Sequence, residues 1–405
     1  MKIKPIENAF AFLALMFTAG AIAQNNNPTV KIGEINSYST APEFTVPYRK
    51  GWQLAVDEIN AAGGIEGRKI EVFSRDDGND RNEAAQVARS LISREKVDVL
   101  AGTYLSNTGL AVSAVAAKNK KLFIAAGPLS DAITLDRGNR YTFRLRPSTY
   151  MQAAMLAEEA AKLPARRWAM LAPNYEYGQS AVANFKSMLK ARRPDIEFVA
   201  EQWPALNKID AATVVQRLEK ARPDAIFNAT FGADLDKFVH EGKRRGLFGK
   251  VMVASMLGGE PENLKILKDA TPKGWIVTGY PANQIDTPAH ARFAHAYFEK
   301  YNDHPQIGSV IGYTMILAIA EGVRKAQSTD SEKLVTAMRG FQFATPMGPA
   351  VFRAIDQQAT LGTYVGILDQ KNGNGFMTNW RYADGAKYLP DEAYVRRRRP
   401  ASAIK

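Results

Sequence analysis

Residues 97–126 read VDVLAGTYLSNTGLAVSAVAAKNKKLFIAA. The apolar run at 97–102 predicts a buried strand, the pattern at 108–118 predicts a helix, and 122–126 predicts a second strand. Strand, helix and strand in succession form the unit from which parallel sheets with helical faces are built. This stretch therefore predicts an α/β fold, and the neighbouring sequence extends it in both directions.

The same alternation covers most of the chain. Further strands are predicted at 30–35, 69–74, 168–172, 198–202, 225–229 and 251–255. Further helices are predicted at 51–62, 82–95, 150–162, 179–191, 212–221, 233–245, 288–301, 308–326 and 332–340. A chain of 405 residues exceeds the size at which one core stops growing. We therefore expect two doubly wound parallel-sheet lobes, with a polar stretch near residues 146–148 between them.

The N-terminus has the pattern of a secretory signal peptide over residues 1–23. Lys2 and Lys4 precede an apolar run at 9–23, which ends in the small-residue cleavage pattern Ala21-Ile22-Ala23. The chain contains no cysteine, so it forms no disulfides and offers no cysteine for a lipid anchor. We expect export to the periplasm without lipid attachment.

The formal net charge is +12 at pH 7, and most of the charges are scattered singly along predicted helices. One dense block, Arg396 to Arg399, lies near the C-terminus. We interpret residues 396–405 as a solvated basic tail, because export separates the protein from nucleic acid. The net charge favours anionic solutes, and no nucleic-acid partner is expected.

The sequence lacks the usual catalytic motifs. It has no G-x-S-x-G elbow, no phosphate-binding Walker loop and no metal-ligand pair of histidines at helical spacing. The four histidines, His240, His290, His295 and His304, fall in predicted helices or at their edges and are expected to be solvated. We expect a binding protein rather than an enzyme, with no cofactor and no metal.

In doubly wound sheets, ligands bind beyond the carboxyl ends of the strands, so the loops after each strand are the informative ones. These loops combine aromatic rings with hydroxyl and amide groups, as small-molecule clefts do. Ser106, Asn107 and Thr108 stand at a strand-to-helix corner. Two roles are open for them, namely capping the helix and receiving a carboxylate.

Six segments together resemble ABC-transporter solute-binding proteins of the branched-chain amino-acid/amide group, which have the type I periplasmic-binding fold. They are KIGEINS (31–37), GWQLAVDEINAAGGIEGRKIEV (51–72), DDGNDRNEAAQVARSLISREKVDVLAG (76–102), YTFRLRPS (141–148), NYEYGQS (174–180) and ARPDAIFNATFGAD (221–234). The resemblance implies two lobes joined by three crossings. Lobe one would be 24–147 with 280–357, and lobe two 148–279 with 358–395.

The resemblance also implies a ligand clamped between the lobes of a monomer, which then meets permease subunits in the inner membrane. It places a carboxylate at Ser106–Thr108 and an aromatic cover at Phe44. The implied ligand-binding residues are Tyr38, Phe44, Tyr104, Ser106, Asn107, Thr108, Gly127, Pro128, Leu129, Ser130, Tyr175, Tyr177, Phe231, Gly232, Met256 and Leu257.

One departure bears on the ligand. Amino-acid binders of this family place an acid after the strand at 251–255, whereas this chain has Met256-Leu257-Gly258-Gly259, and Glu260 comes late. A buried ammonium without a paired anion costs several kcal/mol. The expected ligand is therefore a small carboxylate with an apolar or aromatic body.

Two alternatives stay open. Asp234, Glu176 or Glu260 could pair an ammonium, which would make the protein a branched-chain amino-acid or amide binder. The same fold also serves ligand-sensing receptor components.

Overall fold

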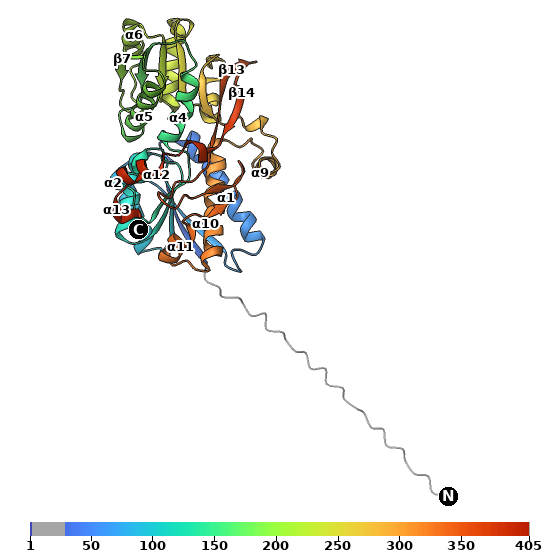
Figure 1. The fold of residues 1–405 in the computed structure, drawn as a ribbon. Coiled ribbons are helices and arrows are strands. Elements are labelled where there is room, and N and C mark those ends of the chain that lie inside the picture. The colour runs from blue at the N-terminus through green and yellow to red at the C-terminus, as the bar shows by residue number, and fades with distance from the viewer. Residues whose placement is uncertain (2–28, 405) are drawn as a thin grey trace.

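The computed structural model describes Met1 and residues 29–404. The predicted signal peptide, apart from Met1, lies outside the described residues. Two separate sheets, each with helices on both faces, stack along the long axis of the molecule (Figure 1). This arrangement confirms the predicted α/β fold of two doubly wound lobes.

The first sheet contains five parallel strands in the order β2-β1-β3-β4-β5. Its strands are β1 (Val30–Asn36), β2 (Ile70–Asp76), β3 (Val99–Gly102), β4 (Leu122–Ala125) and β5 (Thr142–Arg144). On one face, α2 (Arg81–Ser93) and α3 (Ser106–Lys118) pack against Ile35 and Leu100. On the other face lie α1 (Pro42–Ala61) and α10 (Ile307–Ala326), and α9 (Pro288–Tyr301) and α11 (Ser331–Met338) complete this lobe. The small pair β11 (Gln342–Phe343) and β12 (Ala350–Val351) follows α11.

The second sheet has seven strands in the order β14-β13-β10-β9-β8-β6-β7. Its strands are β6 (Arg167–Leu171), β7 (Glu197–Gln202), β8 (Ala225–Asn228), β9 (Met252–Gly259), β10 (Ile276–Gly279), β13 (Thr363–Lys371) and β14 (Asn374–Ala383). The first five of these run parallel, and β13 and β14 extend the sheet antiparallel. The helices of this lobe are α4 (Thr149–Ala160), α5 (Glu176–Arg192), α6 (Ala211–Ala221), α7 (Gly232–Arg244) and α8 (Pro261–Leu267).

The chain passes between the lobes at four places, after β5, after β10, after β12 and after β14. The first three are the crossings of the predicted hinge. After β14 the chain returns once more to the first lobe, where α12 (Glu392–Arg398) and α13 (Ala401–Ile404) lie on its surface (Figure 1). Val395 is fully buried there against Leu135 and Ile355.

The expectation of a solvated basic tail is wrong for part of the segment. Arg396, Arg397 and Arg398 are exposed, but Arg399 is buried. Its guanidinium donates to the carbonyls of Asp356 (3.0 Å) and Asn139 (3.1 Å). A single arginine that satisfies several buried carbonyls anchors this end of the chain, and composition alone cannot distinguish such a residue from its solvated neighbours.

Helix α10 is the one described helix whose length and composition would suffice to cross a membrane, and 78% of its apolar window is buried in the protein. It packs closely along α1 because glycines remove side chains at the contact. A Cβ at Gly51 would lie 2.0 Å from the Ser309 carbonyl oxygen, and one at Gly312 would lie 2.2 Å from that of Tyr48. Helix α10 is thus a core helix of the first lobe.

Two elements differ from their predictions in ways that matter for the site. Helix α1 begins at Pro42, where the missing N–H of proline costs nothing, so Phe44 stands on a helix rather than in a loop. Strand β9 runs on to Gly259, so the segment Met256–Gly259 is strand rather than loop. The predicted helix at 82–95 starts as expected, with the Asp80 carboxylate accepting from the N–H groups of Asn82 and Glu83.

Candidate functional site

The carboxyl ends of strands from both sheets face a small cavity between the lobes, of about 20 Å³. Loops after β3, β4 and β5 supply one side, and segments after β6 and β8 together with β9 supply the other. The lining residues are Tyr104, Leu105, Ser106, Gly127, Leu129, Arg146, Tyr175, Tyr177, Phe231 and Leu257. Eight of these ten belong to the predicted ligand-binding set.

Aromatic rings from both lobes fill most of this space. Tyr104 stacks on Phe44 with ring centroids 4.4 Å apart, and its edge meets Phe231 at 6.0 Å. Phe231 in turn meets Tyr177 at 5.7 Å, and Tyr177 lies 5.9 Å from Tyr175. The rings form a continuous wall, the aromatic wall, that crosses from lobe one to lobe two and favours a flat apolar ligand.

Three helices begin at this wall without a side-chain cap. The N-cap positions of α3, α5 and α7 are Leu105, Tyr175 and Phe231, and none makes a side-chain cap hydrogen bond. The capping role considered for Ser106–Thr108 is therefore wrong, since these are the first three residues of α3 rather than its cap. Uncapped helix N-termini carry free N–H groups and partial positive charge, which suits an anion.

The three residues of that corner do different things. The Ser106 hydroxyl accepts from the N–H groups of Leu129 (3.3 Å) and Ser130 (3.1 Å), which ties the loop after β3 to the loop after β4. The Thr108 hydroxyl donates to the Leu105 carbonyl at 3.1 Å. The Asn107 amide oxygen is buried and has no hydrogen-bond partner among the described residues. Of the three, only Ser106 lines the cavity.

A charge pair that the sequence did not predict joins the two lobes beside the cavity. The Arg146 guanidinium, just after β5, pairs with the Glu260 carboxylate, just after β9, and their side chains are only 4% and 7% exposed. The same guanidinium lies over the Phe44 ring, 5.6 Å from its centroid. Burial raises the pKa of Glu260, and Arg146 opposes that shift.

A second carboxyl stands close to this pair. Glu262, on α8 of lobe two, accepts through one oxygen from the Gly308 N–H at the start of α10 in lobe one, at 2.7 Å. Its other oxygen, Oε2, is buried and has no partner among the described residues. Burial, reinforced by the nearby Glu260 charge, raises the pKa of Glu262 to about 8.

The signal for Arg146 was present in the segment YTFRLRPS, which holds two arginines at the carboxyl end of a strand. The structure separates them. Arg144 is buried in lobe one, where it donates to the Leu129 carbonyl (3.0 Å) and the Thr134 hydroxyl (3.1 Å). Arg146 lines the cavity instead, because it lies two residues beyond the end of β5, where the side-chain alternation of the strand no longer applies.

Eight predicted residues are absent from the cavity lining, namely Phe44, Asn107 and Thr108, described above, and five others. Tyr38 turns to the first sheet, where its hydroxyl donates to Glu34 at 3.0 Å. Pro128 fills the space beside Gly109, where a Cβ would lie 2.4 Å from it. The Ser130 hydroxyl accepts from the Ala132 N–H, and Met256 is buried in the core of lobe two. Gly232, with φ of 55°, donates to the Asn263 side chain at 2.8 Å beside a neighbouring small pocket.

The structure also separates the three acids considered as ammonium partners. Asp234 accepts from the N–H groups of Asn207 (2.7 Å) and Ile209 (3.1 Å), so it holds a loop of lobe two. Glu176 pairs with Arg137 at 3.5 Å on the surface. Glu260 alone of the three is buried against a residue that lines the cavity.

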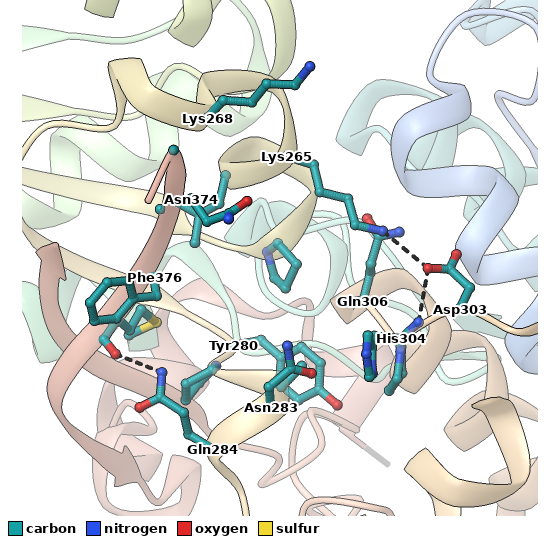
Figure 2. Close-up of a pocket in the computed structure, with 18 residues that line it drawn as sticks. Lys265, Lys268, Tyr280, Asn283, Gln284, Asp303, His304, Gln306, Asn374 and Phe376 are labelled. Atoms are coloured by element: carbon teal, nitrogen blue, oxygen red, sulfur yellow. Dashed lines mark hydrogen bonds and ion pairs between the residues drawn. The ribbon is translucent and has the colours of Figure 1, made fainter. Parts of the chain in front are cut away.

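A larger pocket, of about 500 Å³, lies on the hinge side of the molecule. Figure 2 shows its walls, which come from α8, the segment after β10, the loop before α10 and the turn between β13 and β14. Its charged groups are engaged or exposed, as with Lys265, which pairs with Asp303 at 3.5 Å. None of the sixteen predicted site residues lines it.

His304 lines the larger pocket, whereas the described residues that line the small cavity include no histidine. Among the described residues, no group of three or more His, Cys, Asp or Glu side chains is placed to hold a metal ion. The expectation that all histidines are solvated is wrong for His290, which is 1% exposed and hydrogen-bonded to the Tyr280 hydroxyl. Burial lowers the pKa of His290, so a neutral ring packed in the core is favoured.

Comparison with known proteins adds sequence and structural relatives. A "Leu/Ile/Val-binding protein homolog 7" of Brucella suis is 28% identical over 368 residues, which cover 85% of this chain and 87% of the relative. A homolog 8 of Brucella melitensis is 27% identical, with 86% and 87% covered.

Solved structures share the fold closely. A solute-binding protein of an ABC transporter from Rhodopseudomonas palustris, in complex with 3,4-dihydroxybenzoic acid, has a TM-score of 0.80 at 24% identity, with 90% of this chain and 99% of that chain covered. A branched-chain amino-acid transporter protein from the same species has a TM-score of 0.73 at 24% identity, with 89% and 98% covered. The sequence model of the family described as "Periplasmic binding protein" matches residues 29–374. The chain therefore belongs to the periplasmic binding protein family.

Proposed function

We propose that this protein is the periplasmic solute-binding component of an ABC importer and that it clamps a small carboxylate with an apolar or aromatic body. The observation that carries the proposal is the position of Arg146, a buried cation set between the aromatic wall and the uncapped start of α3. Arginine and free helix N–H groups are both strong partners for a carboxylate. The rings beside them suit the remainder of such a ligand.

The ligands of the structural neighbours have this chemistry. Three Rhodopseudomonas palustris proteins, with TM-scores of 0.80, 0.79 and 0.77, are in complex with 3,4-dihydroxybenzoic acid, 4-hydroxybenzoate and benzoate. Each of these ligands is a flat ring that bears one carboxylate. At 24%, 20% and 20% identity the likeness to this chain is one of fold, and the support for an aromatic acid comes from the wall and Arg146.

The cavity of about 20 Å³ holds little more than one water, so a ligand must part the lobes or displace rings to enter. The crossings after β5, β10 and β12 are the natural hinge for that motion. Transport then requires the ligand to bind the closed form more tightly than the open one. The closed form would be the species that permease subunits in the inner membrane recognise.

Several features accompany this function. The proposed lobe boundaries are 24–147 with 280–357 and 148–279 with 358–390. The expected end of lobe two at residue 395 is moved to 390, and the segment from 391 onward is assigned to lobe one, because Val395 packs there. Residues 1–23 act as the export signal, and the protein works as a soluble periplasmic monomer without a catalytic role.

A branched-chain amino acid or amide is the second candidate ligand. The observation in its favour is Glu260, whose buried carboxylate stands where an ammonium could meet it. The Brucella relatives named as Leu/Ile/Val-binding protein homologs point the same way. In this case Arg146 would take the ligand carboxylate and Glu260 the ammonium.

A thermal-shift screen of the chain from residue 24 onward separates the candidates. The panel contains benzoate, 4-hydroxybenzoate, aliphatic monocarboxylates, leucine, valine and simple amides. A ligand at a hundredfold excess over its dissociation constant adds about 2.7 kcal/mol, which raises the melting midpoint by a few degrees. Shifts with the acids support the proposal, and shifts confined to leucine and valine replace it with the second candidate.

A further inference from the structure

The charged groups beside the cavity belong to different lobes but form one buried cluster. Arg146 follows strand β5 of lobe one, while Glu260 and Glu262 lie at the start of α8 in lobe two. Glu262 adds a second contact between the lobes through the Gly308 N–H. The cluster therefore holds one cation and two carboxyls in a space that water scarcely enters.

The charges balance only if one carboxyl is protonated. Arg146 neutralises Glu260, with which it is in contact, and the free oxygen of Glu262 has no cation or donor against it among the described residues. An unpaired buried carboxylate is costly, so Glu262 is held neutral. With Arg146 charged, Glu260 ionised and Glu262 protonated, the cluster carries no net charge.

Among the described residues, the cation that acts on both carboxyls of the cluster is Arg146. The other titratable neighbours are phenols: the charge of Glu260 acts on Tyr104 and Tyr177, and that of Glu262 acts on Tyr280 and Tyr297. Glu43 of α1 acts on Tyr104 from the lobe-one side. The phenols stay neutral at physiological pH because burial raises the pKa of each of them well above its usual value. Any added negative charge must therefore be met by Arg146 or by a proton.

We propose that a ligand carboxylate displaces Glu260 from its ion pair with Arg146 and that the Glu260–Glu262 pair binds one proton from solvent in the same step. The inference rests on the proposed function, since it concerns a carboxylate ligand at Arg146. The balance is simple: the ligand brings one negative charge, one proton enters onto a carboxyl oxygen, and the cluster stays neutral. No bond other than the O–H bond forms.

Two consequences follow for the ligands this site selects. A ligand with one negative charge and no positive one binds more weakly as the pH rises, by up to tenfold per pH unit where uptake is complete. A zwitterion supplies its own positive charge to Glu260 and needs no proton. The number of protons bound with each ligand thus reports whether a proton or the ligand's own positive charge neutralises the carboxyl pair. The bound proton is assigned to the pair rather than to one of the two residues.

Calorimetric titration of the wild-type protein with benzoate measures this number directly. The titration is carried out at pH 7 in phosphate and again in Tris. The difference between the two observed binding enthalpies equals the number of protons exchanged, multiplied by the difference between the ionisation enthalpies of the two buffers. We expect uptake of about one proton per benzoate, and an affinity that falls by several-fold to tenfold between pH 6.5 and pH 7.5. Benzoate itself stays ionised over this range.

The Glu260→Gln variant removes the displaced carboxylate. Its benzoate affinity should become nearly independent of pH over the same range, with proton uptake reduced towards zero. The matched control is Glu197→Gln, which removes an exposed carboxylate on β7 that pairs with Arg167 at 3.1 Å. The control should keep the wild-type uptake. If Glu260→Gln fails to fold, the wild-type titration at several pH values still shows whether benzoate binding is coupled to proton uptake.

The outcomes separate the two proposals. Benzoate binding without proton uptake, or uptake that persists in Glu260→Gln, overturns this inference and leaves the proposed function standing. Binding of leucine alone, with no carboxylic acid bound, overturns both. Uptake with benzoate that is lost only in Glu260→Gln supports both.

Discussion

Two of the spaces between the lobes differ in size and in lining. The cavity at the strand ends measures about 20 Å³ and is lined by aromatic rings and the buried Arg146, whereas the hinge-side pocket measures about 500 Å³ and is lined by residues of α8, β14 and the adjoining loops (Figure 2). The smaller space holds a buried cation beside an uncapped helix start. Uncompensated helix ends and buried charge, rather than empty volume, therefore identify the candidate site.

The largest expected effect comes from removing the cation of the small cavity. Arg146→Met should lower affinity for a carboxylate ligand at least a hundredfold, because a charge-assisted pair in a dry site is lost. It should also lower the free energy of unfolding by about 3–5 kcal/mol, since Glu260 is left buried without its partner. Calorimetry and chemical unfolding measure the two effects.

The matched control for this change lies in the other pocket. Lys268→Met removes a cation from the hinge-side lining and should leave carboxylate affinity within twofold of wild type. Equal losses in the two variants would mean that general charge, rather than the position of Arg146, attracts the ligand. The double variant Arg146→Met with Glu260→Gln should regain stability without regaining binding.

A buried carboxyl that lines neither pocket tests whether burial alone makes acids pH-sensitive here. Glu34 is fully buried on β1, and burial raises its pKa from 4.5 to about 7, although Ser74 (2.6 Å) and Tyr38 (3.0 Å) donate to it. Between these pKa values the folded protein binds one more proton than the unfolded chain. Stability should therefore fall as the pH rises from 4.5 to 7, by on the order of 3 kcal/mol from this group.

Glu34→Gln should remove that part of the pH dependence and leave benzoate binding and its proton uptake unchanged. Thermal unfolding of both proteins at several pH values between 4.5 and 8 gives the comparison. A slope that persists in the variant would assign the dependence to other groups, Glu262 first among them.

A moderate effect is expected from the aromatic wall. Tyr104→Ala removes the ring that stacks on Phe44 at 4.4 Å and touches Phe231. Affinity for benzoate should fall by about 2 kcal/mol, or roughly thirtyfold, because both the apolar contact and the ring pairing are lost. The affinity for aliphatic acids should fall less than the affinity for benzoate. An equal fall for both kinds of ligand would argue against ring stacking as the source of selectivity.

The smallest effect belongs to the hinge-side pocket. Lys265→Ala breaks a pair with Asp303 at 3.5 Å that is largely exposed, so stability should change by about 0.2–1 kcal/mol at most. Asp303 keeps its second partner, Lys50, at 3.3 Å. Benzoate affinity should not change measurably, and a clear loss would show that this pocket communicates with the cavity through the hinge.

Much of the architecture could be predicted from the sequence. The apolar runs and helical periodicity placed most helices and strands within a few residues, because these patterns reflect local burial. The rule that ligands lie beyond the carboxyl ends of parallel strands led to Tyr104, Tyr175, Tyr177 and Phe231, which the structure brings together. Which of them contact a ligand stays a prediction.

The tertiary structure alone decided the electrostatics of the site. Arg146 and Glu260 are separated by 114 positions and meet because two different sheets end at the same cavity. The Tyr38 hydroxyl donates to Glu34, and the buried Arg399 donates to carbonyls from two segments distant in sequence, 134–139 and Asp356. Local patterns record which face of an element is buried, but the partners across a cavity depend on how whole lobes pack, and no short stretch of sequence contains that information.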